Sequence, residues 1–280
     1  MYVLSVFPGE GQGEVMEEQP KKWRPQGGFW LAVLVIAAFV GMDVLGTQFI
    51  QDTTARLLID SLVRVVFGAL SLWLLIKYFD KGSWRNVIHG KNLGAALLAG
   101  GGVLIYILAE IIIVFTKTPA SYWRELKSIP WQLLFADLIC QQITTGFFEE
   151  ITFRGLLLEG YYQHGERTGR RRLVYGLLSG VLFAALHIGS GSELFAGVFG
   201  FAMAAIYLHS HNILVPMVLH FLQDLAAHAM GYETQLVMIE MWPVWALLAL
   251  LVVWAVAFLL LPAKRLPLRG EGGPPAVDEV

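Results

Sequence analysis

Residues 146–160, GFFEEITFRGLLLEG, place two adjacent glutamates and an arginine in an otherwise apolar run. A charge inside a bilayer costs from about 2.5 to more than 10 kcal/mol, so charged residues within a membrane span usually face the protein interior, pair and serve a function. If this run crosses a membrane, Glu149, Glu150 and Arg154 mark a site that the fold is built around.

The composition supports a membrane setting. Of 280 residues, 56% are hydrophobic and only 15% charged, which is not the balance of a soluble domain. A membrane-spanning helix needs about 20 mainly apolar residues. Windows of roughly this length occur at 29–48, 57–78, 93–115, 131–160, 173–189, 194–209, 212–230 and 241–261. The sequence therefore predicts an all-α polytopic membrane bundle of about eight transmembrane helices, in which the fourth window is too long for one plain span.

One domain accounts for the chain. Residues 1–27 and 263–280 are polar or rich in Pro and Gly, and we expect a flexible cytoplasmic N-terminus and a disordered C-terminal tail. Residues 28–262 form the expected transmembrane domain. The single Cys140 excludes an intrachain disulfide and a CxxC metal site. No internal repeat of the solenoid or transporter type is found.

The distribution of Lys and Arg among the loops predicts the orientation. With both termini in the cytoplasm, the external loops carry only Arg56, Lys117, Arg124 and Lys127, and the other loop and tail cations are cytoplasmic. We expect an integral membrane protein of the plasma (inner) membrane of a prokaryote. Its expected partners are the lipid bilayer and a membrane-associated peptide or protein substrate. We expect no binding to nucleic acid, and the sequence leaves the oligomeric state open.

The glutamates lie deep in the predicted fourth span. If the hydrocarbon core ends near Tyr161, Glu149 is about 12 residues inside, or roughly 18 Å at 1.5 Å per residue. Glu150 and Arg154 are spaced i, i+4 and can pair along one helix face. Glu149 is offset by about 100° and can face another helix.

Two later windows can supply polar neighbours at a similar depth. In LLSGVLFAALHIG the main polar group is His187, one turn after Phe183. In ILVPMVLHFLQDLAAHAM, His220 and Asp224 are spaced i, i+4, and His228 continues that face. We therefore expect Glu149, His187 and His220 to lie at broadly similar depth on three helices.

These residues resemble the signatures of a known family. EEITFRG is similar to the EExxxR signature, FAALH to FxxxH and HFLQD to HxxxN/D of the CPBP (CAAX protease and bacteriocin-processing, or ABI) family, which includes the type II CAAX prenyl endopeptidases. The three signatures occur in the family's order, each on a separate predicted span. The resemblance covers about residues 130–230.

The resemblance implies an intramembrane endopeptidase with its site in a water-filled cavity open to the cytoplasm. It implies Glu149 as the general base, His187 as a residue that binds and polarises the attacking water, and His220 with Asp224 as the oxyanion-stabilising pair. Glu150, Arg154 and Phe183 are implied as supporting residues. The implied substrates are membrane-associated, either CAAX-type proteins or bacteriocin and other precursor peptides.

The residues leave a metal mechanism open. An ionised Asp224 cannot donate a hydrogen bond to an oxyanion, so it is protonated, orients His220 or does something else. Glu149, His187 and His220 with a water would form a His2Glu catalytic zinc site, in which Asp224 could be a fourth ligand or could bond to one of the ligands. The zinc signature HExxH is absent. We favour a metal-free site without a cofactor and keep zinc as the alternative.

Other functions and roles are compatible with the same residues. Buried ionisable groups also occur in ion- or proton-coupled transporters, and a catalytically inactive immunity or scaffold protein could retain this fold. Arg154 is expected to be structural, and Asp60 and Arg64 to neutralise each other within the second window. Packing hydrogen bonds suffice for Glu110 and Gln141. The spacing of Gly176 and Gly180 favours close helix packing.

Overall fold

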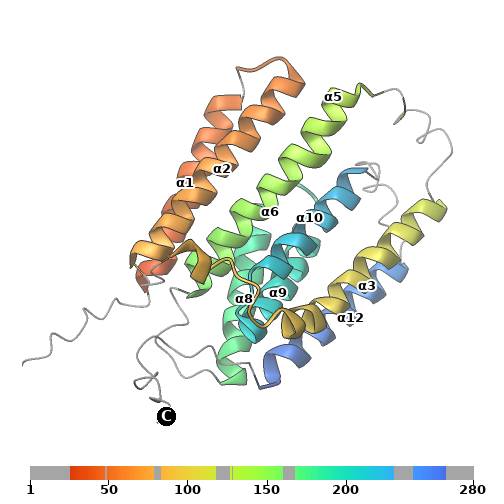
Figure 1. Ribbon diagram of the computed structural model, residues 1–280. Coiled ribbons are helices and arrows are strands. Elements are labelled where there is room, and N and C mark those ends of the chain that lie inside the picture. Colours follow the sequence, from red (N-terminus) through yellow and green to blue (C-terminus); the bar gives the residue numbers. More distant parts are fainter. Residues whose placement is uncertain are drawn as a thin grey trace, which may run out of the picture.

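The protein is described by a computed structural model that covers residues 26–47, 49–78, 83–117, 127, 129–159, 168–229 and 242–262. All regular elements in these ranges are helical, as Figure 1 shows, which confirms the predicted all-α membrane bundle. Of the two predicted tails, only Gln26 and Gly27 are described, and they begin the first helix.

Every predicted window corresponds to a helical segment. The plain helices are α1 (Gln26–Thr47), α2 (Thr53–Tyr78), α3 (Leu93–Lys117), α8 (Gly169–Leu186), α9 (Glu193–Ser210), α10 (Leu214–Ala229) and α12 (Trp242–Leu260), with a short 3₁₀ turn η1 (Trp84–Asn86) before α3. The long fourth window is one run of four segments, α5 (Trp131–Leu134), η2 (Phe135–Gln141), α6 (Gln142–Glu150) and η3 (Ile151–Glu159).

The fourth run changes its helical winding three times. Its segments η2 and η3 are π-helical, whereas α5 and α6 are α-helical. Glu149 and Glu150 end α6, and Arg154 lies in η3, so the predicted charges flank an α-to-π junction. π-Helical turns are rare and are often found at functional sites.

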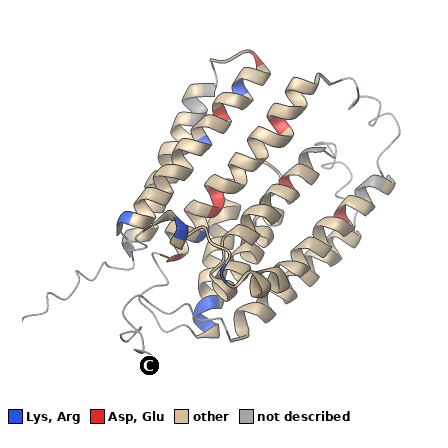
Figure 2. Ribbon diagram, in the orientation of Figure 1, with Lys and Arg blue, Asp and Glu red and all other residues tan. Residues whose placement is uncertain are grey.

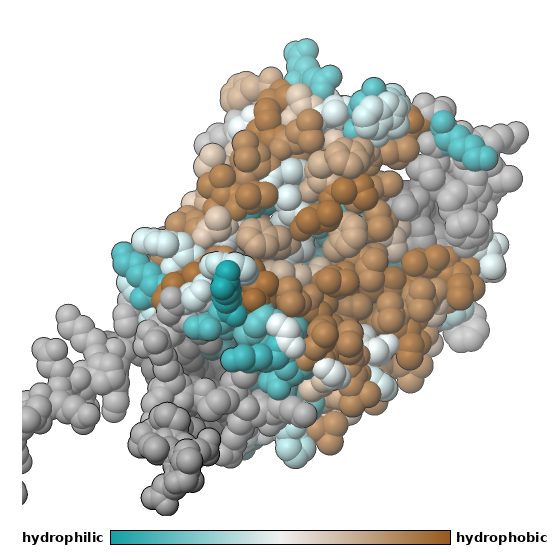
Figure 3. Space-filling view, viewed as in Figure 1, coloured by the Kyte–Doolittle hydropathy of each residue, from teal (hydrophilic) through white to brown (hydrophobic). Residues whose placement is uncertain are grey.

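Four described helices are long and apolar enough to cross a membrane. They are Thr53–Tyr78, Leu93–Ile113, Glu193–Ser210 and Pro243–Leu260, while the apolar helices Gly28–Met42 and Leu214–Ala227 are shorter. Large apolar side chains cover the outside of the bundle, seen as the brown surface in Figure 3, and Ile105 and Val253 are among the exposed ones. Such a surface suits lipid, and the chain is an integral membrane protein.

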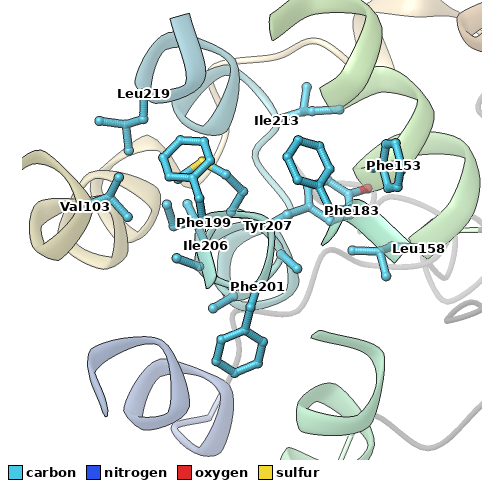
Figure 4. Close-up of a cluster of buried hydrophobic side chains, with 14 of the residues drawn as sticks. Val103, Phe153, Leu158, Phe183, Phe199, Phe201, Ile206, Tyr207, Ile213 and Leu219 are labelled. Carbon is cyan, nitrogen blue, oxygen red and sulfur yellow. The ribbon is translucent and has the colours of Figure 1, made fainter. Parts of the chain in front are cut away.

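Helix α9 forms the centre of the bundle. Its apolar window is 72% buried, whereas those of the other three candidate spans are 33% to 39% buried. Side chains from α3, η3 and α8 converge on it in the cluster drawn in Figure 4. A Cβ atom at Gly180 of α8 would lie only 2.8 Å from the carbonyl oxygen of Gly197 in α9, which confirms close packing at the predicted small residues.

Helix α10 lies between α6 and α3 (Figure 1) and contacts both. On the α6 side the approach is close: a Cβ atom at Gly146 would stand 3.2 Å from the carbonyl oxygen of Met217 and 3.7 Å from Cβ of His220. The missing side chain at Gly146 therefore lets the end of α6, with its two glutamates, approach the histidine of α10.

Candidate active site

His220 is the centre of the site. Its Nδ1 atom lies 2.7 Å from Oε1 of Glu150, in hydrogen-bonding distance. Its Nε2 atom lies 3.6 Å from Oε2 of Glu149 and 3.5 Å from Oδ2 of Asp224. The ring is 2% exposed. One buried imidazole thus contacts three carboxyl groups, and Figure 2 shows the acidic residues, in red, on α6 and α10 where these two helices lie side by side.

The predicted pair of Glu150 and Arg154 is confirmed. Nη1 of Arg154 lies 3.1 Å from Oε1 of Glu150, and both side chains are fully buried. Nη2 of Arg154 donates a 2.9 Å hydrogen bond to the carbonyl oxygen of Gly200 in α9. The guanidinium also lies over the ring of Phe183, 5.1 Å from its centroid. A buried pair of this kind is costly to break, because the partner that remains is an uncompensated charge.

Exposure divides the carboxyl groups into two sets. The side chains of Glu149 and Asp224 are 18% and 23% exposed, whereas that of Glu150 is fully buried. The accessible face of the site therefore consists of the Glu149 carboxyl, Nε2 of His220 and the Asp224 carboxyl. Glu150 lies behind it and reaches only the far nitrogen of the histidine.

His187 lies at the C-terminal cap of α8, near the site but turned to its own helix. Its Nδ1 atom is 2.9 Å from the carbonyl oxygen of Phe183. The Phe183 ring lies 5.0 Å from the His187 ring and 5.8 Å from the His220 ring, so both histidines contact one phenylalanine. Among the described residues, no ion-pair contact within 4.0 Å joins His187 to Glu149. The structure brings His187 to this region but not to direct contact with the base.

Aromatic rings surround the buried part of the site. Phe153 and Phe183 meet edge to face at 5.2 Å, as their side chains in Figure 4 show. Phe199 of α9 packs its edge against His220 at 5.3 Å. Phe183 was expected as a supporting residue, whereas nothing in the local sequence pointed to Phe199.

The zinc alternative required two histidines and Glu149 around one ion. In the parts of the chain that the structure describes, no group of three or more His, Cys, Asp or Glu residues is arranged to hold a metal. His187 directs Nδ1 to a backbone carbonyl, and Nδ1 of His220 contacts Glu150. The side chains in these positions do not form the His2Glu set, and the metal-free expectation stays a prediction.

Several polar pairs between helices were not predicted as pairs. Nε2 of Gln223 in α10 donates a 2.8 Å bond to Oε2 of Glu110 in α3, and Nε2 of Gln141 donates a 2.9 Å bond to Oδ2 of Asp60. Asp60 also pairs with Arg64, as expected. The side chain of His228, named as a possible continuation of the polar face, lies outside the described residues.

Comparison with known proteins confirms the family resemblance. The family described as Rce1-like, type II CAAX prenyl endopeptidase Rce1-like, matches residues 130–226. The matched segment includes Glu149, His187, His220 and Asp224. No curated protein and no solved structure matches the chain. The match is to a protease family and supports an endopeptidase embedded in the membrane.

Proposed function

We propose, from the match of residues 130–226 to the type II CAAX prenyl endopeptidases, that this chain is an intramembrane endopeptidase of the CPBP group. It hydrolyses a peptide bond of a membrane-associated substrate with a water molecule that Glu149 deprotonates. The proposed location is the plasma membrane of a prokaryote.

One observation carries the proposal. Glu149 and Asp224, the partly exposed carboxyl groups, flank the same nitrogen of His220, at 3.6 and 3.5 Å. A base and possible hydrogen-bond donors are thus adjacent on one accessible face, which is the arrangement that hydrolysis of an acyl group requires. A substrate carbonyl placed against this face would meet all three groups.

Glu149 is the proposed general base. Its carboxylate takes a proton from water while the water oxygen bonds to the carbonyl carbon, and the carbonyl π electrons move to the oxygen. When the tetrahedral intermediate collapses, the C–N bond breaks and the same carboxyl returns the proton to the leaving nitrogen. Buried Oε2 of Glu149 makes no hydrogen bond within the described residues, so its capacity to accept a proton is not used by another side chain.

His220 and Asp224 are the proposed oxyanion-stabilising pair. With Nδ1 bonded to Glu150, the ring presents Nε2 to the accessible face. When the ring is protonated on both nitrogens, Nε2–H and a protonated Asp224 can both donate to the oxyanion, and donors fixed in advance stabilise the charge that develops there. Glu150 and Arg154 are proposed to fix the ring and not to touch the substrate.

His187 is proposed to position the attacking water. Its Nδ1 contact with the Phe183 carbonyl fixes the ring orientation, and the ring then offers Nε2 to a polar neighbour. In the described residues, His187 and Glu149 form no ion pair. A water molecule that bridges two groups separates them, so His187 can hold the water that Glu149 deprotonates without touching Glu149.

The proposed substrates are CAAX-type proteins or precursor peptides such as those of bacteriocins. The test uses purified protein in liposomes with a panel of lipid-anchored peptides, and mass spectrometry of the products. We expect cleavage by the wild type and none by Glu149→Gln. The matched control is Asp52→Asn, the same change at an exposed helix cap where Asn serves as well. Equal products from Glu149→Gln and wild type would refute the assignment.

A further inference from the structure

We propose that Glu110 and Tyr106 of α3 are positioning residues that set the place of the His220 ring. The inference rests on the proposed function, because the position of the His220 ring affects a reaction only if peptide hydrolysis takes place at its Nε2 side. Helix α3 lies outside the family match, which begins at residue 130 and carries all the motif residues. Figure 2 shows an acidic segment, in red, on α3.

The first contact is a hydrogen bond to the backbone element that carries the histidine. Gln223 is 1% exposed and lies on α10 between His220 and Asp224 in sequence. Its Nε2 donates to Oε2 of Glu110 at 2.8 Å. Because α10 is a single helix here, this bond fixes its rotation, and the rotation decides where His220 and Asp224 point.

The second contact runs through aromatic rings to the imidazole itself. Tyr106, which is 2% exposed, packs on Phe195 at 6.1 Å. Phe195 stacks on Phe199 at 6.0 Å, and Phe199 meets His220 edge to face at 5.3 Å. Tyr106 and Glu110 are spaced i, i+4, so both contacts toward His220 start from one face of α3.

Helix α3 is itself held from the other side. Nε1 of Trp254 in α12 donates a 2.9 Å bond to the carbonyl oxygen of Ala99. Helix α10 contacts α6, which carries the two glutamates, on one side and α3 on the other. The bond from Trp254 holds α3 in place behind it. Such a brace matters because a displacement of about 1 Å in a reacting group can cost about a hundredfold in rate.

A carboxyl group is an expensive way to pack two helices in a membrane. Leucine would fill the space at Glu110 without a polar cost, and hydrogen bonds between membrane helices average only about 0.6 kcal/mol. Replacing Glu110 by Leu should therefore leave the folded state intact. The benefit of the Glu110 carboxyl lies in the orientation of α10, a property that a melting temperature does not report.

The test compares variants that remove the bond with one that keeps it. Glu110→Leu and Gln223→Leu should lower kcat at least about tenfold, with KM within about twofold and the melting temperature in detergent unchanged. Glu110→Gln retains an acceptor oxygen for Gln223 and should stay within about threefold of wild type. Gln141→Leu is the matched control: it also removes an amide donor from a carboxyl on another helix, but not at α10.

A second readout does not depend on catalysis. The ¹⁵N signals of His220 in selectively labelled protein, assigned with His220→Gln, should shift in Glu110→Leu and Gln223→Leu but not in Gln141→Leu. Unshifted signals, equal shifts in the control, or activity losses that follow lowered melting temperatures would overturn the brace. If the wild type cleaves no peptide while the His220 signals shift as expected, the peptidase proposal fails and the brace stands.

Discussion

The carboxyl group of Glu150 bonds to the imidazole of His220 across 70 residues of sequence, with 2.7 Å between Oε1 and Nδ1. The same oxygen lies 3.1 Å from Nη1 of Arg154. Glu150 therefore joins α6, η3 and α10 at one atom. The two adjacent glutamates have different surroundings, since one faces the accessible side of His220 and the other its buried side.

This difference predicts opposite effects of two identical substitutions. Glu149→Gln should abolish cleavage and leave the detergent melting temperature near wild type, because its side chain is partly exposed and lies in no buried ion pair with Arg154. Glu150→Gln should lower the melting temperature as well, since it leaves Arg154 charged and unpaired at a cost of about 3 to 5 kcal/mol. Activity assays and thermal melts of both variants measure this. The reverse ranking would exchange the roles of the two glutamates.

Asp224 offers a test of oxyanion stabilisation. Asp224→Asn keeps a hydrogen-bond donor beside Nε2 of His220 and should stay active within about tenfold, or about 1.4 kcal/mol of transition-state energy. Asp224→Ala removes the donor and should be much less active. Steady-state kinetics on one peptide decide between them. An inactive Asn variant would show that the carboxylate itself is required.

Metal dependence is predicted to be absent. Chelator treatment should leave wild-type activity unchanged, and elemental analysis should find no stoichiometric metal in the purified protein. One zinc per chain, with zinc and activity lost together in Asp224→Asn, would favour a metalloprotease, because an amide is a poor substitute for a carboxylate ligand.

The helices and the local ion pairs could be predicted from the sequence. Apolar windows of sufficient length identified the described helices except the short turn η1, and the i, i+4 spacing identified the ion pairs of Glu150 with Arg154 and of Asp60 with Arg64. These features depend on residues close in sequence and on a helical period that hardly varies. The same spacing predicted His220 beside Asp224, and Nε2 of His220 lies 3.5 Å from Oδ2 of Asp224.

The contacts between distant helices could not be predicted. Glu110 with Gln223 and Glu150 with His220 depend on how each helix is rotated in the bundle, which a nearly uniform apolar sequence does not specify. The π segments η2 and η3 resemble their α-helical neighbours in composition. The bond of His187 to the Phe183 carbonyl depends on the local end of α8.

Because α6 packs closely on α10 at Gly146, we expect substitution of this glycine to impair activity. In Gly146→Ala the new methyl would lie 3.2 Å from the Met217 carbonyl oxygen, so α10 must yield by a few tenths of an ångström and carry His220 with it. We expect activity to fall more than stability, which should drop by on the order of 1 kcal/mol. Gly101→Ala, where a Cβ meets nothing within 4 Å, is the control and should match wild type in both assays. Equal behaviour of the two variants would contradict this packing.

Helix α8 is too short for an unperturbed bilayer. It has 18 residues, and from the buried Arg172 in its first turn to His187 it rises only about 22 Å, against a hydrocarbon thickness of about 30 Å. The irregular turn that follows, residues 188–192, has Gly189 and Gly191 at positive φ, and both donate their N–H groups to the Glu193 carboxylate. A span shorter than the hydrocarbon is accommodated by local thinning of the membrane, by snorkelling of flanking residues or by oligomerisation. With the proposed function, local thinning would shorten the path by which water, the second reactant, reaches His187, and we expect turnover in liposomes to depend on acyl chain length.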